Sequence, residues 1–251
     1  MVNVILHGAS GHMGQVVTDM IAADPDCRIV AGVDAVNLGN RSYPVYTNLA
    51  DCREEADAVI DFSTAKAVDG LVAYCAERRL PLVLCTTGLT EEQVKNVQAA
   101  SEKTAILRSG NMSLGVNLLI KLLKQAAAVL SPNGYDAEVV EMHHRRKIDA
   151  PSGTALMLAD AVNEGADGGY HYTYDRSERH EKRNPKEIGI SSVRGGTIVG
   201  VHDVIFAGED EVIEFTHTAY SRAIFAKGAI QAAKFLAGKK TGMYDMSDVI
   251  G

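Results

Sequence analysis

The chain has 251 residues, of which 46% are hydrophobic and 23% charged, and its net charge at pH 7 is -7. These values exclude a protein that binds nucleic acid non-specifically, and no apolar run looks long enough to span a bilayer. Four widely spaced cysteines without a CxxC pair argue against a zinc ribbon or a disulfide framework, and a short first strand without a basic leader favours a cytoplasmic location.

The chain opens with a pattern typical of a strand, a glycine turn and a helix. Residues 2–6 are mostly apolar, and the apolar residues of 13–21 then repeat at intervals of three and four, as on one helix face. Between them lie Gly8, Gly11 and Gly14. Glycines at such a turn allow a tight bend and close approach to a pyrophosphate at the helix amino end. The spacing is GxxGxxG rather than GxGxxG, so a purely structural turn stays open.

A second strand is expected over residues 27–34, and it ends at Asp34. An acidic side chain about 20 residues past the glycines can accept hydrogen bonds from an adenosine ribose, which favours a nicotinamide dinucleotide. Because a carboxylate repels a ribose phosphate, NADH should be accepted readily. His12 or Arg41 could still reach such a phosphate, so the use of both NADH and NADPH stays open.

Strand and helix patterns continue to alternate up to residue 111, which predicts a doubly wound parallel sheet of the Rossmann type. The expected segments are 56–63, 65–79, 81–88, a helix from 91, and 104–111. Thr90 and Gln93 have the spacing of a capping box. Ligands bind beyond the carboxyl ends of such strands, so the loops 61–64, 85–88 and 109–113 should border the cofactor. Their small polar residues also suit purely local turn roles.

After Gly115 the pattern changes, which indicates a second domain. Residues 116–132 have a helical apolar face, and 188–220 read as β-rich segments without helices between them, as in an α+β domain with a mixed or antiparallel sheet. The polar stretch 163–187 predicts a surface loop or arm. An amphipathic helix over 221–240 should return to the first domain. We expect 1–112 with 222–251 to bind the dinucleotide, and 113–221 to bind substrate and form a homo-oligomer.

The segment 141–155 carries the strongest chemical signal in the chain. A strand over 137–144 would point His143 and His144 to opposite faces. Pro151 suits the first turn of the next helix and Ser152 suits its cap, so the amides of 152–154 should face outward and bind a carboxylate or phosphate. The basic residues 145–147 add positive charge. A small polyanionic substrate fits this pattern, and a solvated basic loop is the alternative.

A metal site is not expected, although the chain has histidines that could be considered. These are His143, His144, His171, His180, His202 and His217. Adjacent histidines of a strand point apart, and no H-E-x-x-H spacing occurs. Hydrogen bonding is the ordinary role of such histidines.

With these segments in place, the chain resembles the dihydrodipicolinate reductases (4-hydroxy-tetrahydrodipicolinate reductases) of bacterial lysine biosynthesis from end to end. The likeness rests on GASGHMG, DFST, CTTG, GNMSLGVN, EMHHRRKIDAPSGTA, VRGGTIVGVH and MYDMSDVIG. The run HHRRKIDAPSGTA is the most specific, whereas many dinucleotide enzymes share the glycine turn. The resemblance implies an NAD(P)H-dependent oxidoreductase and homotetramer of lysine and diaminopimelate biosynthesis. It would transfer hydride from NADH or NADPH to a cyclic imine dicarboxylate, with loss of water, and yield tetrahydrodipicolinate.

The resemblance also implies roles for individual residues. The acid and base residues of the family fall on His143 and Lys147, and its substrate contacts on His144, Gly153 and Thr154. Its cofactor contacts fall on Gly8, Ala9, Ser10, Gly11, His12, Met13, Asp34, Cys85, Thr86, Thr87, Gly88, Gly110, Asn111, Met112 and Ser113. Reduction of the ring leaves charge that a proton must quench, and Lys147 is the expected donor. His143 either donates as well or orients the substrate.

Two alternatives remain at the level of sequence. An aspartate-semialdehyde or homoserine dehydrogenase relative would share the first domain, and the former would need a nucleophilic cysteine. Cys85 is the only cysteine in a cofactor loop, and it departs from the glycine that many dihydrodipicolinate reductases carry there. A non-catalytic dinucleotide sensor would use the second domain as a partner-binding surface, but it leaves the cluster from His143 to Thr154 unexplained.

Overall fold

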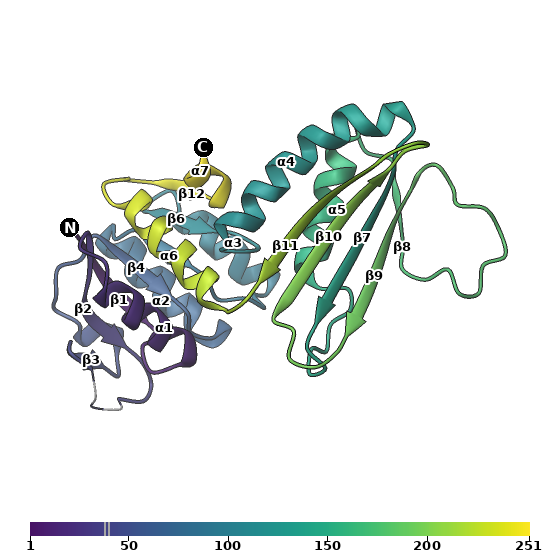
Figure 1. Cartoon of the computed structure of the whole chain (residues 1–251). Coiled ribbons are helices and arrows are strands. Elements are labelled where there is room, and N and C mark those ends of the chain that lie inside the picture. Colours follow the sequence, from purple (N-terminus) through teal and green to yellow (C-terminus); the bar gives the residue numbers. More distant parts are fainter. Residues whose placement is uncertain (38, 40) are drawn as a thin grey trace. The chain divides into compact units, whose positions relative to one another are not determined.

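A computed structural model describes residues 1–37, 39 and 41–251, and it divides the chain into two compact units (Figure 1). The first unit comprises Met1–Ser113 and Ala223–Gly251, and the second comprises Leu114–Arg222. These boundaries lie one residue from those expected. The roles assigned to the two parts of the chain from the sequence stay predictions at this point.

The first unit is built on a seven-stranded sheet in the order β12-β6-β5-β4-β1-β2-β3, and every adjacent pair is parallel. The predicted doubly wound sheet is therefore confirmed. The strands are β1 Val2–His7, β2 Cys27–Val33, β3 Val45–Tyr46, β4 Ala58–Asp61, β5 Leu82–Leu84, β6 Ala105–Arg108 and β12 Gly242–Tyr244. The helices are α1 His12–Ala22, η1 Leu49–Asp51, α2 Ala65–Arg78, α3 Glu91–Ala100, α6 Ala223–Leu236 and α7 Met246–Ile250.

The local sequence explains most of these elements. Apolar residues of neighbouring strands, among them Ile5, Val59 and Leu82, are buried in one core with the inner faces of α2 and α3. The Thr90 hydroxyl accepts the amide hydrogen of Gln93 at 3.2 Å and the Gln93 side chain accepts that of Thr90 at 3.1 Å, so the predicted capping box is confirmed. The short edge strands β3 and β12 carry too few residues to show an alternating pattern.

The second unit contains a five-stranded mixed sheet in the order β11-β10-β7-β9-β8. Strand β10 is antiparallel to β7 and β11, whereas β9 is parallel to β7 and β8. The expected mixed sheet is therefore confirmed. Its elements are α4 Leu114–Leu130, η2 Ser131–Asn133, β7 Asp136–His143, α5 Gly153–Gly165, β8 His171–Thr173, β9 Glu187–Arg194, β10 Gly200–Ala207 and β11 Val212–Ala219. Helices α4 and α5 cover one face of this sheet (Figure 1).

Helix α4 corrects one expectation from the sequence. The stretch Leu114–Asn133 is long and apolar enough to cross a bilayer by length and composition, whereas the sequence had indicated no such run. The apolar residues Leu119, Leu123 and Ala127 are buried against the sheet of the second unit, and Lys124 on another side pairs with Glu164 at 2.7 Å. One face of α4 therefore belongs to the core of the second unit.

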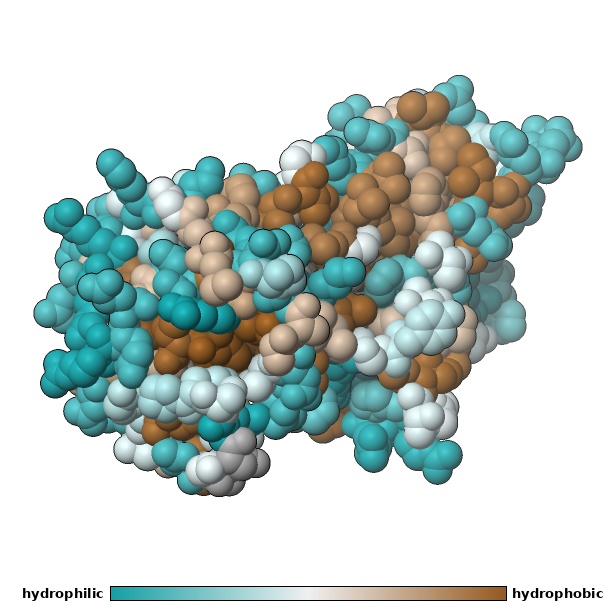
Figure 2. All heavy atoms as spheres, turned by 60° about the vertical axis from the view of Figure 1, so that its left-hand side comes forward, coloured by the Kyte–Doolittle hydropathy of each residue, from teal (hydrophilic) through white to brown (hydrophobic). Residues whose placement is uncertain are grey.

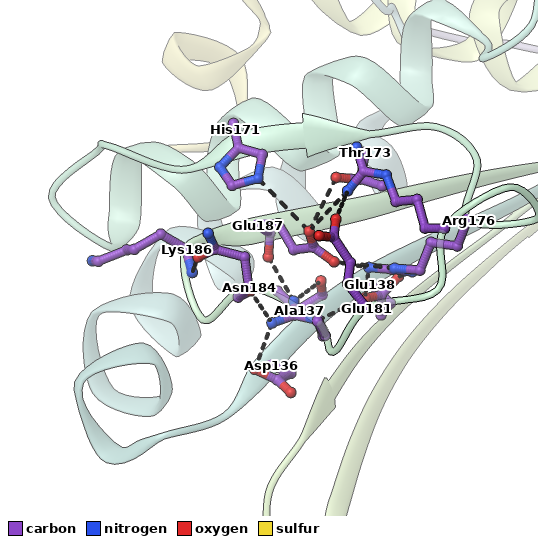
Figure 3. A network of polar contacts seen from close by, with 12 residues as sticks. Asp136, Ala137, Glu138, His171, Thr173, Arg176, Glu181, Asn184, Lys186 and Glu187 are labelled. Carbon is purple, nitrogen blue, oxygen red and sulfur yellow. Dashed lines mark hydrogen bonds and ion pairs between the residues drawn. The ribbon is translucent and has the colours of Figure 1, made fainter.

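The expected loop over 163–187 is shorter than the sequence indicated, because α5 continues to Gly165 and β8 occupies His171–Thr173. The remaining arm, residues 174–186, is anchored by ion pairs at its base (Figure 3). Arg176 bonds the Glu138 carboxylate at 3.0 and 2.7 Å and also reaches Glu187 at 2.6 Å. Arg183 bonds the same Glu138 carboxylate at 3.0 Å.

Candidate functional site

The glycine turn between β1 and α1 closes only with glycine at two of its positions. Gly8 has a φ of +83°, and a Cβ there would lie 2.6 Å from the Phe62 carbonyl oxygen. A Cβ on Gly14 would lie 2.3 Å from the Gly8 carbonyl oxygen. Gly11 is the N-cap of α1, and the amides of 12 and 13 have no acceptor in the described part of the chain. The turn therefore offers an open helix amino end to an anion.

Asp34 fastens this turn to the end of β2. Its carboxylate accepts the Ser10 amide hydrogen at 2.9 Å and the Val36 amide hydrogen at 3.1 Å. A carboxylate has further acceptor positions, so it can also bind ribose hydroxyls. The glycine turn, the helix end and Asp34 together fit a nicotinamide dinucleotide.

Arg41 brings a positive charge to the same turn. Its guanidinium donates to the Ala9 carbonyl oxygen at 2.6 Å and to the side chain of Gln15. Within residues 1–37, 39 and 41–251, no carboxylate forms an ion pair with Arg41. No carboxylate of the described chain thus neutralises the charge of Arg41. His12 is exposed at the start of α1.

A fully buried carboxylate, Asp61, joins the carboxyl ends of three strands. It binds His7 Nδ1 at 2.7 Å, the Ser63 amide at 3.1 Å and the Thr86 hydroxyl at 2.6 Å. The Thr86 hydroxyl is therefore engaged with protein, in a loop where the sequence predicted cofactor contacts. Sequence reasoning missed the roles of His7 and Asp61, although a polar residue that ends an apolar strand is a usable signal.

The remaining cofactor candidates follow β5 and β6, at the same edge of the sheet as the glycine turn. Gly88 has a φ of +74°, and the Asn111 side-chain oxygen accepts the Ser113 amide hydrogen at 2.8 Å. The Met112 carbonyl lies so near Gly228 that a Cβ there would be 1.6 Å from its oxygen. Ala9 and Met112 are buried, whereas Thr87 and Gly110 are exposed.

The four thiols are free, and the environment of Cys85 disfavours a nucleophile. Burial, and after it the neighbouring Asp61 carboxylate, raises the pKa of the Cys85 thiol well above its ordinary value. A protonated thiol is a poor nucleophile. This removes the main support for the semialdehyde dehydrogenase alternative.

In the second unit, strand β7 ends at His143, so His144 lies beyond the strand and not on its opposite face as predicted. The chain turns there, and the Lys147 amide donates to the His144 carbonyl oxygen at 3.0 Å. His143 is 8% exposed. Lys147 pairs with Asp149 at 2.9 Å, which lowers the pKa of the Asp149 carboxyl. The turn thus brings an imidazole and an ammonium into one segment.

Helix α5 begins at Gly153, and the predicted cap is confirmed because the Ser152 hydroxyl accepts the Ala155 amide hydrogen at 3.1 Å. Two details differ from expectation. Pro151 lies before the cap instead of in the first turn, and the Ser152 amide donates to Glu141 at 3.1 Å instead of facing outward. The Gly153 amide has no acceptor among the described residues, and a Cβ on Gly153 would meet nothing within 4 Å. This leaves an open helix end for an anion.

Glu141 connects these parts of the second unit, and sequence reasoning missed it. The side chain is fully buried and binds His143 Nδ1 at 2.5 Å. Arg194 adds two hydrogen bonds, at 2.8 and 2.7 Å. Burial alone would raise the pKa of the Glu141 carboxyl, but hydrogen bonds led by that from Arg194 lower it to about 2. An acidic residue two positions before His143 on a strand was the available signal, because such residues share a face.

Two further histidines line up beside His143 on neighbouring strands. The His202 ring lies 5.1 Å from the His143 ring and 6.4 Å from the His217 ring, centroid to centroid. Burial lowers the pKa of all three imidazoles, that of His202 to about 4. Among the described residues no group of three or more His, Cys, Asp or Glu could hold a metal ion. The row thus consists of imidazoles that are neutral at neutral pH, and hydrogen bonds to Glu141 and Ser152 hold His143 and His202.

Comparison with known proteins finds relatives of both parts of the chain. The family model "Dihydrodipicolinate reductase, N-terminus" matches residues 2–112, and the corresponding C-terminus model matches residues 115–250. The chain is 52% identical over 250 residues to the 4-hydroxy-tetrahydrodipicolinate reductase of Caldanaerobacter subterraneus subsp. tengcongensis, covering 100% of this chain and 98% of that one. It is 45% identical over 246 residues to that of Clostridium tetani, covering 98% and 96%.

A solved structure extends the likeness to three dimensions. Dipicolinate-bound dihydrodipicolinate reductase from Paenisporosarcina sp. TG-14 superposes with a TM-score of 0.81 at 26% identity, over 98% of this chain and 97% of that one. Both halves of the sequence and the whole fold therefore point to one family. The chain belongs to the dihydrodipicolinate reductase family.

Proposed function

We propose that this protein is an NAD(P)H-dependent oxidoreductase that reduces 4-hydroxy-tetrahydrodipicolinate to tetrahydrodipicolinate, a step of lysine and diaminopimelate biosynthesis. One observation carries the proposal: His143 and Lys147 lie in one short segment with the open amino end of α5. A group that can transfer a proton and a site that can bind an anion thus lie side by side. Both the N-terminus and the C-terminus model of the family match this chain. A solved relative from Paenisporosarcina sp. TG-14 is named as dipicolinate-bound.

The substrate is a small dicarboxylate, and the second unit would hold it. The Gly153 amide, the first turn of α5 at Thr154 and the His144 side chain are the proposed contacts. A helix amino end stabilises a carboxylate through its amides and its dipole. Lys147 is the proposed proton donor, and His143 contacts the substrate beside it.

Calorimetric titration with dipicolinate tests this site directly. We expect Gly153→Asp to abolish dipicolinate binding, because a carboxylate at the helix amino end repels the ligand. NADH affinity, which depends on the first unit, should stay unchanged and serves as the control. Wild-type dipicolinate affinity in the variant would refute the anion site.

The first unit would hold NADH or NADPH. The residues from Gly8 to Met13 would bind the pyrophosphate, Asp34 the ribose, and the loops Cys85 to Gly88 and Gly110 to Ser113 the rest of the cofactor. When bound, the cofactor supplies the hydride. Asp34 favours NADH, whereas the charge of Arg41 on the glycine turn supports the use of NADPH as well.

One substitution distinguishes the contribution of Arg41 to NADPH binding from its contribution to NADH binding. Arg41→Gln should weaken NADPH binding about tenfold or more and leave NADH binding within about twofold, because only NADPH carries the added phosphate. Fluorescence titration of both cofactors measures the ratio. Equal loss for NADH and NADPH would show that Arg41 acts only by holding the turn.

Lys147→Ala tests whether Lys147, and not His143, donates the proton. Loss of a proton donor should lower kcat about 100-fold or more, with NADH affinity unchanged. Lys182→Ala removes an exposed lysine of the arm and is the matched control. Near-normal turnover of Lys147→Ala would remove it as the proton donor.

We also propose that the chain forms a homo-oligomer, a tetramer by family resemblance. Large hydrophobic side chains stay exposed on α4, at Leu118, Leu122 and Val129, and on the sheet, at Val193 and Val212. Figure 2 shows hydrophobic residues gathered on the surface as well. Exposed apolar area of this kind favours association. Light scattering should give a particle mass four times that of one chain, and the mass of a single chain would contradict the proposal. The cytoplasmic location expected from the sequence stays a prediction.

A further inference from the structure

The buried carboxylate of Glu141 accepts hydrogen bonds at both of its oxygens. His143 Nδ1 lies 2.5 Å from one oxygen, which also accepts from Arg194 at 2.8 Å. The other oxygen accepts from Arg194 at 2.7 Å and from the Ser152 amide at 3.1 Å. The carboxylate therefore accepts these four hydrogen bonds from three residues, and the bidentate guanidinium of Arg194 fixes its plane.

The charge of Glu141 decides which hydrogen the neighbouring imidazole carries. With its pKa lowered to about 2, Glu141 is ionised throughout the working pH range and can only accept hydrogen bonds. His143 Nδ1 must then hold a hydrogen, which places the lone pair of the neutral ring on Nε2. The charged or titratable groups facing this ring are Glu141, Lys147, Arg194 and His202.

The surroundings of Nε2 are kept open by a small residue. A Cβ on Gly200 of the adjacent strand β10 would lie 3.1 Å from Nε2 of His143, closer than most real contacts, and 3.5 Å from its Cδ2. Glycine at this position therefore leaves the outer edge of the ring uncrowded. Nδ1 is held by the protein, and Nε2 is the nitrogen left to meet a ligand.

We propose that Glu141, clamped by Arg194, is a positioning residue that fixes the tautomer and the ring orientation of His143, so that His143 acts on the substrate only through Nε2. This rests on the proposed function. A proton that passes between His143 and the substrate enters or leaves at Nε2, while the Nδ1 hydrogen stays directed at Glu141. An oriented imidazole needs no reorganisation when the substrate binds.

The tautomer can be read in the wild-type protein without any assay of activity. Solid-state 15N spectra of histidine-labelled protein, with the His143 signals identified by their loss in His143→Gln, should show a protonated Nδ1 and an unprotonated Nε2 at neutral pH. The opposite tautomer would overturn the proposal. Failure of the proposed reductase function would leave this spectrum unchanged, so the two failures are distinguishable.

Glu141→Gln then tests whether the contact matters for turnover. An amide must turn its NH2 toward Arg194 or His143, so it cannot satisfy all four donors. We expect the His143 tautomer to change and kcat to fall about 100-fold or more, with NADH affinity unchanged. Glu141→Asp keeps the charge and should recover part of kcat. Glu138→Gln, on the same strand but in the arm network, is the matched control and should keep kcat.

A kcat within about threefold of wild type in Glu141→Gln, with the wild-type tautomer, would overturn the proposal. If Glu141→Gln does not fold, Arg194→Gln replaces it, since the carboxylate then keeps its bond to His143 but loses the clamp. We expect kcat to fall at least about tenfold in Arg194→Gln, with NADH affinity unchanged. Wild-type kcat there would show that the clamp plays no part.

Discussion

Buried His202 should make the second unit sensitive to mild acid. It is 4% exposed, and its Nε2 lies 3.0 Å from the Ser152 hydroxyl. That hydroxyl also accepts the Ala155 amide hydrogen, so Ser152 links His202 to the first turn of α5. A second proton on the ring would place a positive charge in this buried position. Burial, and after it the charge of His143, accordingly lowers the pKa of His202 from 6.5 to about 4.

The size and sign of the effect follow from linkage. The unfolded chain binds the proton first as the pH falls, so stability is complete above about pH 6.5 and is lost progressively down to about pH 4. At about 1.4 kcal/mol per pKa unit the full loss is about 3 kcal/mol, and about 2 kcal/mol of it is already lost at pH 5. His143 and His217, whose pKa values are also lowered, add to the same trend.

Urea unfolding of wild type and His202→Gln at pH 7 and pH 5, followed by circular dichroism, isolates the contribution of this histidine. The difference in unfolding free energy between the two pH values should be about 2 kcal/mol smaller in His202→Gln than in wild type. His180→Gln, which changes an exposed histidine of the arm, should match wild type. An identical pH dependence in wild type and His202→Gln would refute the reasoning.

Three further predictions concern the scaffold. Gly14→Ala should destabilise the protein by about 1–3 kcal/mol and weaken NADH binding, because its Cβ would lie 2.3 Å from a carbonyl oxygen. Gly70→Ala, whose Cβ would meet nothing within 4 Å, should instead stabilise the protein by about 0.5–1 kcal/mol. Urea unfolding that finds Gly14→Ala more stable than Gly70→Ala would contradict this. Asp61→Asn should lower the free energy of unfolding by about 1–3 kcal/mol and weaken NADH binding, because an amide side chain cannot accept hydrogen bonds from His7, the Ser63 amide and Thr86 together. An unchanged NADH affinity would show that this hydrogen-bonded cluster does not support the cofactor site. Arg176→Gln should speed thermolysin cleavage within 174–186 while kcat stays unchanged, and an unaltered cleavage rate would show that the ion pairs do not anchor the arm.

The features that could be predicted from the sequence are those set by neighbouring residues. The capping box at Thr90 and Gln93 and the cap at Ser152 depend on residues three apart, and both are confirmed. The strands of the first unit follow from short apolar runs between turn residues. The short motifs that carry the family resemblance are local in the same sense. For this reason the amino-acid sequence was sufficient to predict the fold class.

The features that could not be predicted depend on contacts between distant segments. Arg194 reaches Glu141 because β9 lies parallel to β7, with His143 opposite Arg194 in the register, and nothing local to either strand indicates that pairing. Asp61 and His7 meet in the same way, on adjacent strands β4 and β1. The end of β7 at His143 was missed as well, because a turn closed at Lys147 overrides the apolar pattern.

The central claim is tested most directly by NADH absorbance in a mixture of this protein, pyruvate, aspartate semialdehyde and the upstream synthase, repeated with NADPH. Absorbance should fall only when every component is present, and the two initial rates rank the cofactors. If neither cofactor is consumed although both bind, the reductase assignment is contradicted, and a non-catalytic dinucleotide-binding protein becomes the better account of this chain.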